Sequence, residues 1–181
     1  MRRVLLCSLA FAIGAAGAAT SDDASARVDR RAVTPSEYLE KRIKFWRGET
    51  WRWQRLMGRP LTPTSRSARR TQNLDYKRWV MKLWQKRAGQ MWVKVKTPPR
   101  KNAWMCIHGH EGAWDDPNPP YYGGLQMDMS FMRAYGRELL RRKGTADNWT
   151  PLEQMWVAER AYRSGRGFYP WPNTARYCGL I

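Results

Sequence analysis

Apolar residues recur at helical spacing in two long stretches of the first hundred residues. In the first stretch, alternating steps of four and three residues join Leu39, Ile43, Trp46, Thr50, Trp53 and Met57. This spacing places them on one face of a helix. The run from Thr34 to Glu37 supplies a capping hydroxyl, a proline and an early carboxylate, and Gly58 and Pro60 follow the last apolar residue. The pattern predicts a helix that begins after Thr34 and ends near Gly58.

The second stretch carries Tyr76, Val80, Leu83 and Trp84, flanked by Trp79, Met91 and Trp92, and Pro98-Pro99 ends it. Each stretch places aromatic side chains on a basic helix that a Thr-Pro turn follows. We therefore expect residues 34–98 to form an αα-hairpin.

Shorter elements are predicted beyond residue 100. A helix from Asn102 to about His110 buries Trp104 and Ile107, and a proline-rich loop covers residues 114–120. Residues 121–127 favour short extended structure, and a helix over residues 130–142 buries Phe131, Tyr135 and Leu139. The last predicted helix opens with a capping box at Thr150-Pro151-Leu152-Glu153, ends at Gly165 and buries Leu152, Trp156 and Tyr162. The tail over residues 171–178 is predicted to be irregular, so the fold class is α+β and mostly helical.

The first residues have the layout of an export signal. Two arginines precede an apolar run from Val4 to Ile13, and small residues follow as far as Ala19. The run is shorter than the ~20 residues that span a bilayer, so we expect a signal peptide over residues 1–19 rather than an anchor. Leu6 precedes Cys7 where a lipoprotein signal has a small residue. Residues 20–33 are polar without a period, which is typical of a disordered linker.

The net charge of +18 is unevenly distributed. Residues 1–100 hold 23 Lys and Arg against 7 Asp and Glu, whereas residues 101–181 hold 10 against 8. The change marks a boundary near Pro98-Pro99. Basic helices with interleaved tryptophans suit nucleic acid, but an export signal favours anionic wall polymers or phospholipid headgroups as partners. A third interpretation is that the tryptophans form the buried seam of the hairpin and the charges its solvated faces.

Export would leave Cys106 and Cys178 as the two cysteines of the mature chain. An isolated even pair in an oxidising compartment is usually bridged, so we expect a disulfide that closes most of the C-terminal region. The competing interpretation is a free, reactive Cys106 beside His108, but the shuttle signature C-x-x-C is missing.

A family resemblance rests on residues 100–181 alone. Trp104-Met105-Cys106, Glu111-Gly112, Trp114, the run Tyr121-Tyr122-Gly123-Gly124-Leu125-Gln126, Trp171-Pro172 and Cys178 resemble the catalytic domain of resuscitation-promoting factors and related transglycosylase-like proteins. The resemblance implies a small lysozyme-like domain that cleaves the sugar backbone of peptidoglycan through one glutamate. Four residues separate Cys106 from Glu111 here, whereas the family's glutamate follows its cysteine directly. Four residues are about one helical turn, so Glu111 keeps a similar direction if the helix continues.

Glu111 is accordingly the predicted general acid and base. The resemblance implies that Gln126 binds the sugar, that Tyr122 stacks on a sugar face and that Gly124 permits close approach to the ligand. Trp114, with Tyr121 and Tyr122, is the expected apolar wall beside the acid, although Tyr121 is explained more simply as a packing residue. Asp115, Asp116 and Asp128 are candidates for a second carboxylate, but a route through one glutamate fits the resemblance better.

No metal and no cofactor are expected. His108, His110 and Glu111 lack the spacing of H-E-x-x-H and a distant third histidine. The expected protein is a secreted, wall-associated monomer that acts on peptidoglycan glycan strands and binds no nucleic acid. Two other functions stay open: a non-catalytic wall-binding module of the same fold, and a cationic membrane-active protein driven by residues 34–98.

Overall fold

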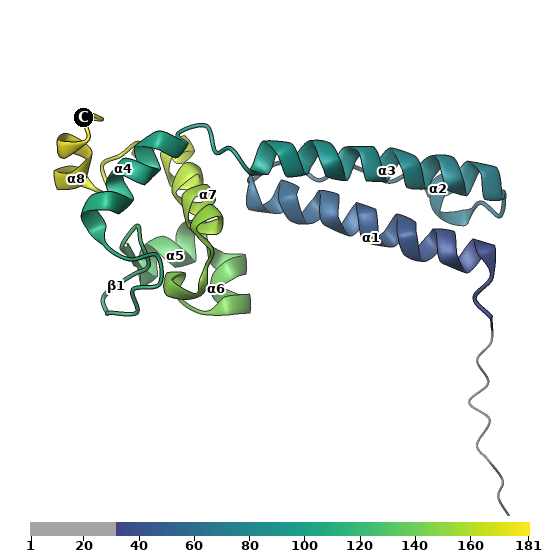
Figure 1. Ribbon diagram of the computed structural model, residues 1–181, viewed down its shortest axis with the longest axis horizontal. Coiled ribbons are helices and arrows are strands. Elements are labelled where there is room, and N and C mark those ends of the chain that lie inside the picture. The colour runs from purple at the N-terminus through teal and green to yellow at the C-terminus, as the bar shows by residue number, and fades with distance from the viewer. Residues whose placement is uncertain (1–31) are drawn as a thin grey trace, which may run out of the picture. The chain divides into compact units, whose positions relative to one another are not determined.

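The computed structural model describes residues 32–181, in which helices predominate (Figure 1). The predicted signal peptide, and all but the last two residues of the predicted linker, lie outside the described residues. Among residues 32–181, no helix combines the length and the apolar character needed to cross a bilayer.

The two long helices are α1 (Pro35–Leu56) and α3 (Leu74–Val95), which lie side by side (Figure 1). They run parallel, because Glu40 near the start of α1 pairs with Lys77 near the start of α3, and Met57 after α1 packs on Val95 at the end of α3. The predicted αα-hairpin, in which the helices would be antiparallel, was therefore wrong, because residues 57–73 run back along the helices before α3 begins. The name hairpin is kept for residues 33–98 as a whole.

The side chain and backbone of Thr34 form a capping box with Glu37, as the sequence predicted. The buried seam includes Leu39 and Ile43 of α1 and Val80 and Trp84 of α3. The interhelical packing of this apolar seam holds the hairpin together.

The seam of α3 differs from the prediction at one position. Tyr76 is 36% exposed, whereas Lys77 beside it is 2% exposed. The Lys77 ammonium donates hydrogen bonds to Ser36 and Glu40 of α1, and Glu40 also supplies its counter-charge. A buried lysine is tolerated because these partners replace water. The apolar pattern alone contains no sign of this interhelical pair.

The connector between the long helices contains a short helix that the sequence pattern did not predict, α2 (Arg66–Arg70), capped by Ser65. Thr62 fixes the connector to α1, because its carbonyl accepts from Trp51 Nε1 at 2.8 Å and its hydroxyl accepts from Gln54 Nε2 at 2.7 Å.

The C-terminal region, residues 100–181, contains mainly short helices. They are α4 (Lys101–Glu111), α5 (Met129–Tyr135), α6 (Arg137–Lys143), the 3₁₀ helix η1 (Ala146–Asn148), α7 (Pro151–Ala161), the π-helical turn η2 (Tyr162–Arg166) and α8 (Pro172–Tyr177). The strands β1 (Tyr121–Tyr122) and β2 (Met127–Asp128) form an antiparallel hairpin in which Tyr122 pairs with Met127. The prediction of a mostly helical α+β chain is therefore confirmed. The capping box predicted at Thr150 is present at the start of α7.

Two predictions in this region were wrong. The helix expected over residues 130–142 is divided at Gly136, where a Cβ atom would lie 2.4 Å from the Trp149 ring. The chain therefore needs a residue without a side chain at this corner. The tail expected to be irregular contains α8, because Pro172 occupies the first helical turn, where its missing N–H is no loss.

Trp104 is the centre of the C-terminal core and is fully buried, as is the predicted Ile107. The Trp104 ring contacts the rings of Phe168 and Trp171 at centroid distances of 5.0 and 5.3 Å. Its indole nitrogen donates to the carboxylate of Glu159, which is also fully buried, at 2.9 Å. Arg100 donates to the same carboxylate from its backbone and its guanidinium. This network ties α4 to α7 and so fixes the helix that carries Glu111.

Residues 33–181 form one compact unit, because the C-terminal ends of α1 and α3 pack on α7. Met57, Val95 and Trp156 form a small buried cluster, and Trp156 Nε1 donates to the carbonyl of Val95 at 2.7 Å. The change in charge near Pro98-Pro99 coincides with the turn between α3 and α4.

Candidate functional site

Glu111 is the last residue of α4 and is partly buried. The helix continues through the four residues that separate Cys106 from Glu111, as the hypothesis of an added turn requires. The hydroxyl of Thr174 on α8 donates to Glu111 Oε1 at 2.7 Å. Thr174 is itself 9% exposed, so a buried donor fixes one oxygen of the carboxyl group. No described residue donates a hydrogen bond to Oε2.

The loop after Glu111 brings Gln126 and Asp116 beside it. A Cβ atom on Gly112 would lie 3.3 Å from Gln126 Nε2 and 3.4 Å from Asp116 Oδ2. Both side chains therefore lie against the residue that follows Glu111. The sequence linked Glu111 to Gln126 only through the family resemblance. In the structure, Gln126 lies against Gly112, the residue that follows Glu111.

The Gln126 amide is held by its own loop. Its nitrogen donates to Asp116 Oδ2 at 2.8 Å and to the carbonyl of Gly123 at 3.0 Å. No described residue donates to its oxygen, which is the atom left to accept from a ligand. Gln126 also has a positive φ of 45°, which is uncommon for a residue with a side chain. The predicted contact between Gln126 and a sugar stays a prediction.

Asp116 is part of this site, although the sequence gave it only as one of three candidates for a second carboxylate. The backbone N–H of Asn118 and the amide of Gln126 both donate to its carboxylate, and they lower the pKa of Asp116 below its ordinary value. The carboxylate therefore remains ionised and holds Gln126 in place.

Trp114 is stacked on His108 of α4, with ring centroids 3.9 Å apart and an interplanar angle of 23°. Gly124 lies beneath this stack, because a Cβ atom there would come within 2.6 Å of His108 Nδ1 and 2.8 Å of the Trp114 ring. This packing explains why residue 124 is a glycine. Its predicted contact with substrate is not needed for that explanation and stays a prediction.

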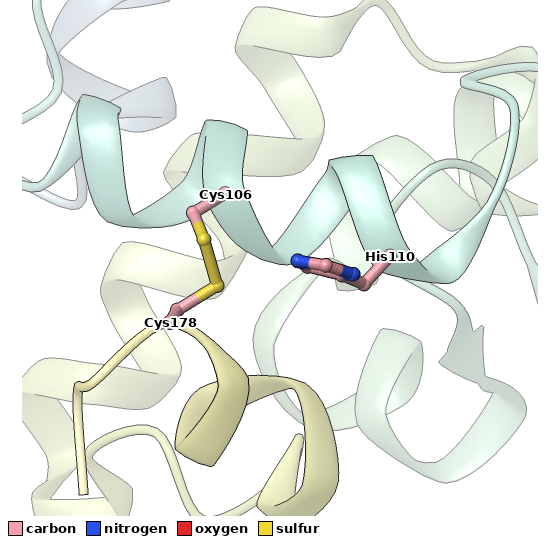
Figure 2. Close-up of side chains that lie close together, drawn as sticks. All are labelled: Cys106, His110 and Cys178. Atoms are coloured by element: carbon pink, nitrogen blue, oxygen red, sulfur yellow. A yellow bond between two sulfur atoms is a disulfide. The ribbon is translucent and has the colours of Figure 1, made fainter.

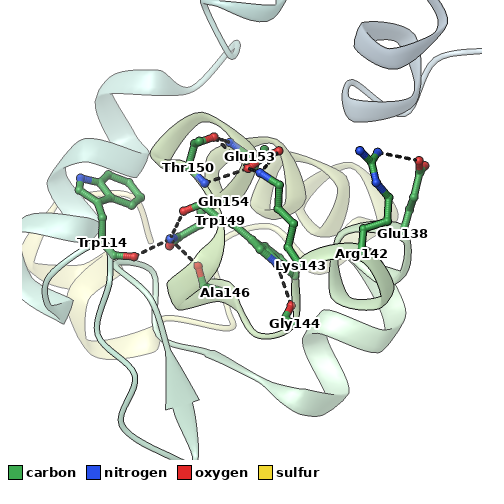
Figure 3. A network of polar contacts seen from close by, with 10 residues as sticks. All are labelled: Trp114, Glu138, Arg142, Lys143, Gly144, Ala146, Trp149, Thr150, Glu153 and Gln154. Atoms are coloured by element: carbon green, nitrogen blue, oxygen red, sulfur yellow. Dashed lines mark hydrogen bonds and ion pairs between the residues drawn. The ribbon is translucent and has the colours of Figure 1, made fainter. Parts of the chain in front are cut away.

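The carbonyl of Trp114 is held from α7. Gln154, which is fully buried, donates to it at 2.7 Å and to the carbonyls of Ala146 and Trp149 (Figure 3). One buried amide thus joins the loop after Glu111 to the turn before α7. The sequence showed Gln154 only as a polar residue within an apolar helix.

The two tyrosines of β1 face opposite ways, as neighbours on a strand do. Tyr122 is partly buried and packs against the core, whereas Tyr121 is 50% exposed. The packing role expected for Tyr121 was therefore wrong. Tyr121 instead lines a pocket of about 180 Å³ together with Gln126, Arg166 and Trp171. Sugar stacking was expected at Tyr122, but Tyr121 presents the more accessible ring.

The disulfide between Cys106 and Cys178 is present and ties α4 to the end of α8, across 72 residues (Figure 2). His110 lies one helical turn beyond Cys106, and its ring nitrogen and the two sulfur atoms lie within 4.8 Å of one another. Both sulfurs belong to the disulfide, so the cluster offers a metal one imidazole and no thiolate. His110 stacks instead on Tyr177, with centroids 5.7 Å apart.

Thr174 is the contact to Glu111 that the sequence did not predict. Its position follows from α8, and the disulfide at Cys178 holds that helix beside α4. A hydroxyl two residues after Trp171-Pro172 and four before Cys178 was the only signal available.

Comparisons of the chain with protein-family models, with curated proteins and with solved structures gave no match.

Proposed function

We propose that this protein is a secreted peptidoglycan-cleaving enzyme with a lysozyme-like domain, and that Glu111 is its general acid and base. The proposal is supported by the position of one carboxyl group. Glu111 is partly buried at the end of α4, Thr174 fixes one of its oxygens, and Gln126 lies against the next residue. A catalytic acid needs such fixed geometry beside a binding group.

Of the three candidates for a second catalytic carboxylate, Asp116 and Asp128 are already engaged, and Asp115 is exposed to solvent. Asp116 accepts from Asn118 and Gln126, and Asp128 accepts from the backbone of Phe131 as the cap of α5. Hydrogen bonds with those backbone amides are the first cause of the lowered pKa of each. Neither carboxylate is free to attack a sugar or to activate water. This arrangement favours the route through one glutamate.

In that route, Glu111 donates a proton to the oxygen that leaves the muramyl carbon. It then accepts a proton from the hydroxyl of the same sugar, whose oxygen bonds to that carbon and closes an anhydro ring. The glutamate returns to its starting protonation state, and no water is consumed. Thr174 holds Oε1 throughout, so Oε2 is the oxygen that exchanges the proton.

The hairpin is proposed to hold the enzyme on anionic wall polymers or phospholipid headgroups. Residues 33–98 contain 17 Lys and Arg against 4 Asp and Glu. Several of these cations lie over indole rings, including Arg47 over Trp51 at 5.1 Å and Lys96 over Trp92 at 4.3 Å. These indoles keep cations at the surface of the hairpin.

The experiment is the release of soluble muropeptides from purified cell walls by the wild-type chain and by Glu111→Gln. The substitution keeps an oxygen that accepts from Thr174, so the fold is retained. We expect the rate to fall at least about a hundredfold. Glu49→Gln, on an exposed face of α1, is the matched control and keeps the wild-type rate. Wall binding without release by the wild type would show a binding module and contradict the proposal.

A further inference from the structure

A pocket of about 130 Å³ lies where the end of α1 meets α6 and α7. Its lining is strongly cationic and includes Arg52, Arg55, Arg142, Lys143 and Arg160, with Glu138 and Glu153 as the acidic residues. The pocket is distinct from the neighbourhood of Glu111 and shares no residue with it. Its volume accommodates a small ion or headgroup but no folded partner.

The two carboxylates are already shared among the cations. Glu138 lies 3.5 Å from Arg142, as drawn in Figure 3, and 3.6 Å from Arg55. The Glu153 carboxylate lies 2.7 Å from the Lys143 ammonium and also accepts from the backbone N–H of Thr150 at the start of α7. Arg52 is paired with Glu49 of α1, so the other four cations face two carboxylates and an excess of positive charge remains at the pocket.

Arg160 is the least compensated of these cations. Among residues 32–181, no ion pair includes it. Its Nε atom is shielded from solvent and has no hydrogen-bond partner within the described part of the chain. Burial and the neighbouring Arg163 lower the pKa of Arg160 to about 10. A largely buried cation without a counter-charge is costly, so the pocket is completed most simply by an anion.

A structural role explains only part of the side chain. Arg160 Nη1 donates to the carbonyl of Arg55 at 3.3 Å, and Arg163 donates to the carbonyl of Met57 at 2.7 Å. These contacts cap the C-terminal end of α1, where cations are favourable. They leave Nε and Nη2 without an acceptor among the described residues, and Nη2 is the one of these two atoms that a ligand can reach.

We propose that this pocket binds a phosphate-type oxyanion, with Arg160 as its principal ligand and Arg55 and Arg142 at its rim. A tetrahedral phosphate offers oxygens in several directions and so reaches guanidinium groups from α1, α6 and α7 at once. A carboxylate offers two oxygens in one plane and satisfies fewer of them. Bound phosphate would tie the end of the hairpin to the C-terminal region.

The experiment measures inorganic phosphate binding to the purified chain by phosphorus NMR and by the shift in Tm, with chloride at matched ionic strength as the reference. We expect a saturable rise in Tm in the wild type. Arg160→Met should weaken phosphate binding about tenfold or more. Arg141→Met removes the same charge from an exposed position on α6 outside the pocket and should bind as the wild type does.

A substitution that should strengthen phosphate binding shows that a loss of binding in Arg160→Met is not merely a folding defect. Glu138→Gln removes the carboxylate that Arg55 and Arg142 share, so it should bind phosphate more tightly than the wild type. Equal binding by the wild type, Arg160→Met and Arg141→Met would show unspecific attraction to a basic protein and overturn the proposal. Absence of saturable binding would also overturn it.

Two further arms separate the sources of the phosphate group. Free glycerol phosphate and vesicles of phosphatidylglycerol carry the same phosphate ester group. The first offers it as a soluble compound, and the second offers it only at a membrane surface. If Arg160→Met weakens binding of the free compound alone, the ligand is a soluble phosphate or a phosphate group on a wall polymer. If Arg160→Met also weakens binding to the vesicles, the ligand is a lipid headgroup. Glu111→Gln should bind phosphate normally, so failure of the catalytic proposal leaves this one standing.

Discussion

The hairpin and the C-terminal region use tryptophan in opposite ways. Of the six tryptophans over residues 33–98, Trp84 alone is buried, and Trp79 is 56% exposed. Of the five beyond residue 100, four are buried and only Trp114 is partly exposed. The hairpin places indoles beneath surface cations, whereas the C-terminal region buries most of its indoles in apolar clusters, as where Trp171 packs on Trp104. A count of tryptophans therefore predicts neither a core nor a binding surface until burial is known.

The two regions also differ in how they are stabilised. The hairpin depends on one interhelical seam, and most of its ion pairs are exposed. The C-terminal region contains a disulfide and two fully buried polar side chains, Gln154 and Glu159, that join separate elements. Loss of one contact should therefore spread through the C-terminal region but remain local in the hairpin.

The largest expected effect comes from Glu159→Ala. The change leaves donors on Arg100 and Trp104 without an acceptor inside the core. Removal of one member of a buried ion pair lowers the free energy of unfolding by about 3–5 kcal/mol. Denaturant unfolding measures it. Glu49→Ala breaks the exposed pair with Arg52 and should cost at most about 1 kcal/mol; equal losses would contradict the contrast between the regions.

Removal of the disulfide by Cys106→Ser together with Cys178→Ser should cost roughly 4 kcal/mol, because the bond closes a long loop. Hydrogen exchange measures where the loss falls. Amides near Ile107 should lose protection, whereas amides near Ile43 and Val80 should keep it. Equal loss in both places would show that the two regions unfold as one.

Val80→Ala should remove about 2 kcal/mol from the hairpin, since Val80 is buried in its seam. Protection of the α1 and α3 amides should fall, while release of muropeptides by the Glu111 site should keep its rate on soluble glycan. A fall in that rate would mean that the hairpin supports the site directly.

The capping boxes allow the smallest and most closely matched comparison. Thr34→Ala and Thr150→Ala should each cost about 1 kcal/mol. The Thr34 backbone N–H, which alanine keeps, and the Thr34 hydroxyl, which alanine removes, both lower the pKa of Glu37. Burial would raise the pKa of Glu153, but hydrogen bonds from Lys143 and Thr150 outweigh it and lower the pKa. A lowered carboxyl pKa contributes stability above the ordinary value of 4.5 that is lost as pH falls below it. Both substitutions should therefore cost less in acid, as thermal unfolding at several pH values would show.

Local signals carried the sequence predictions that were confirmed. Capping boxes at Thr34 and Thr150 depend on neighbours in the chain, and the pairing of Cys106 with Cys178 had one solution after export was assumed. The misses depend on contacts between distant segments. Gly136 divides a helix because Trp149 occupies the space beside it, and Lys77 is buried because α1 supplies Glu40.

The candidate site shows the same limit. The family resemblance led to Glu111 and Gln126, which the fold places near each other. Thr174 was missed because its contact with Glu111 spans 63 residues. The role of Asp116 in holding Gln126 was missed because their hydrogen bond joins residues 10 positions apart. Spacing along the chain contains neither contact.

The mass of the products tests the central claim most directly. Purified walls digested with the wild-type chain should yield muropeptides one water lighter than hydrolysed fragments, because Glu111 recovers its proton from a sugar hydroxyl and no water is consumed. Glu111→Gln should yield no muropeptides. Identical fragments from the wild type and from Glu111→Gln, or no fragments from either, would contradict the assignment of Glu111 as the catalytic acid and base.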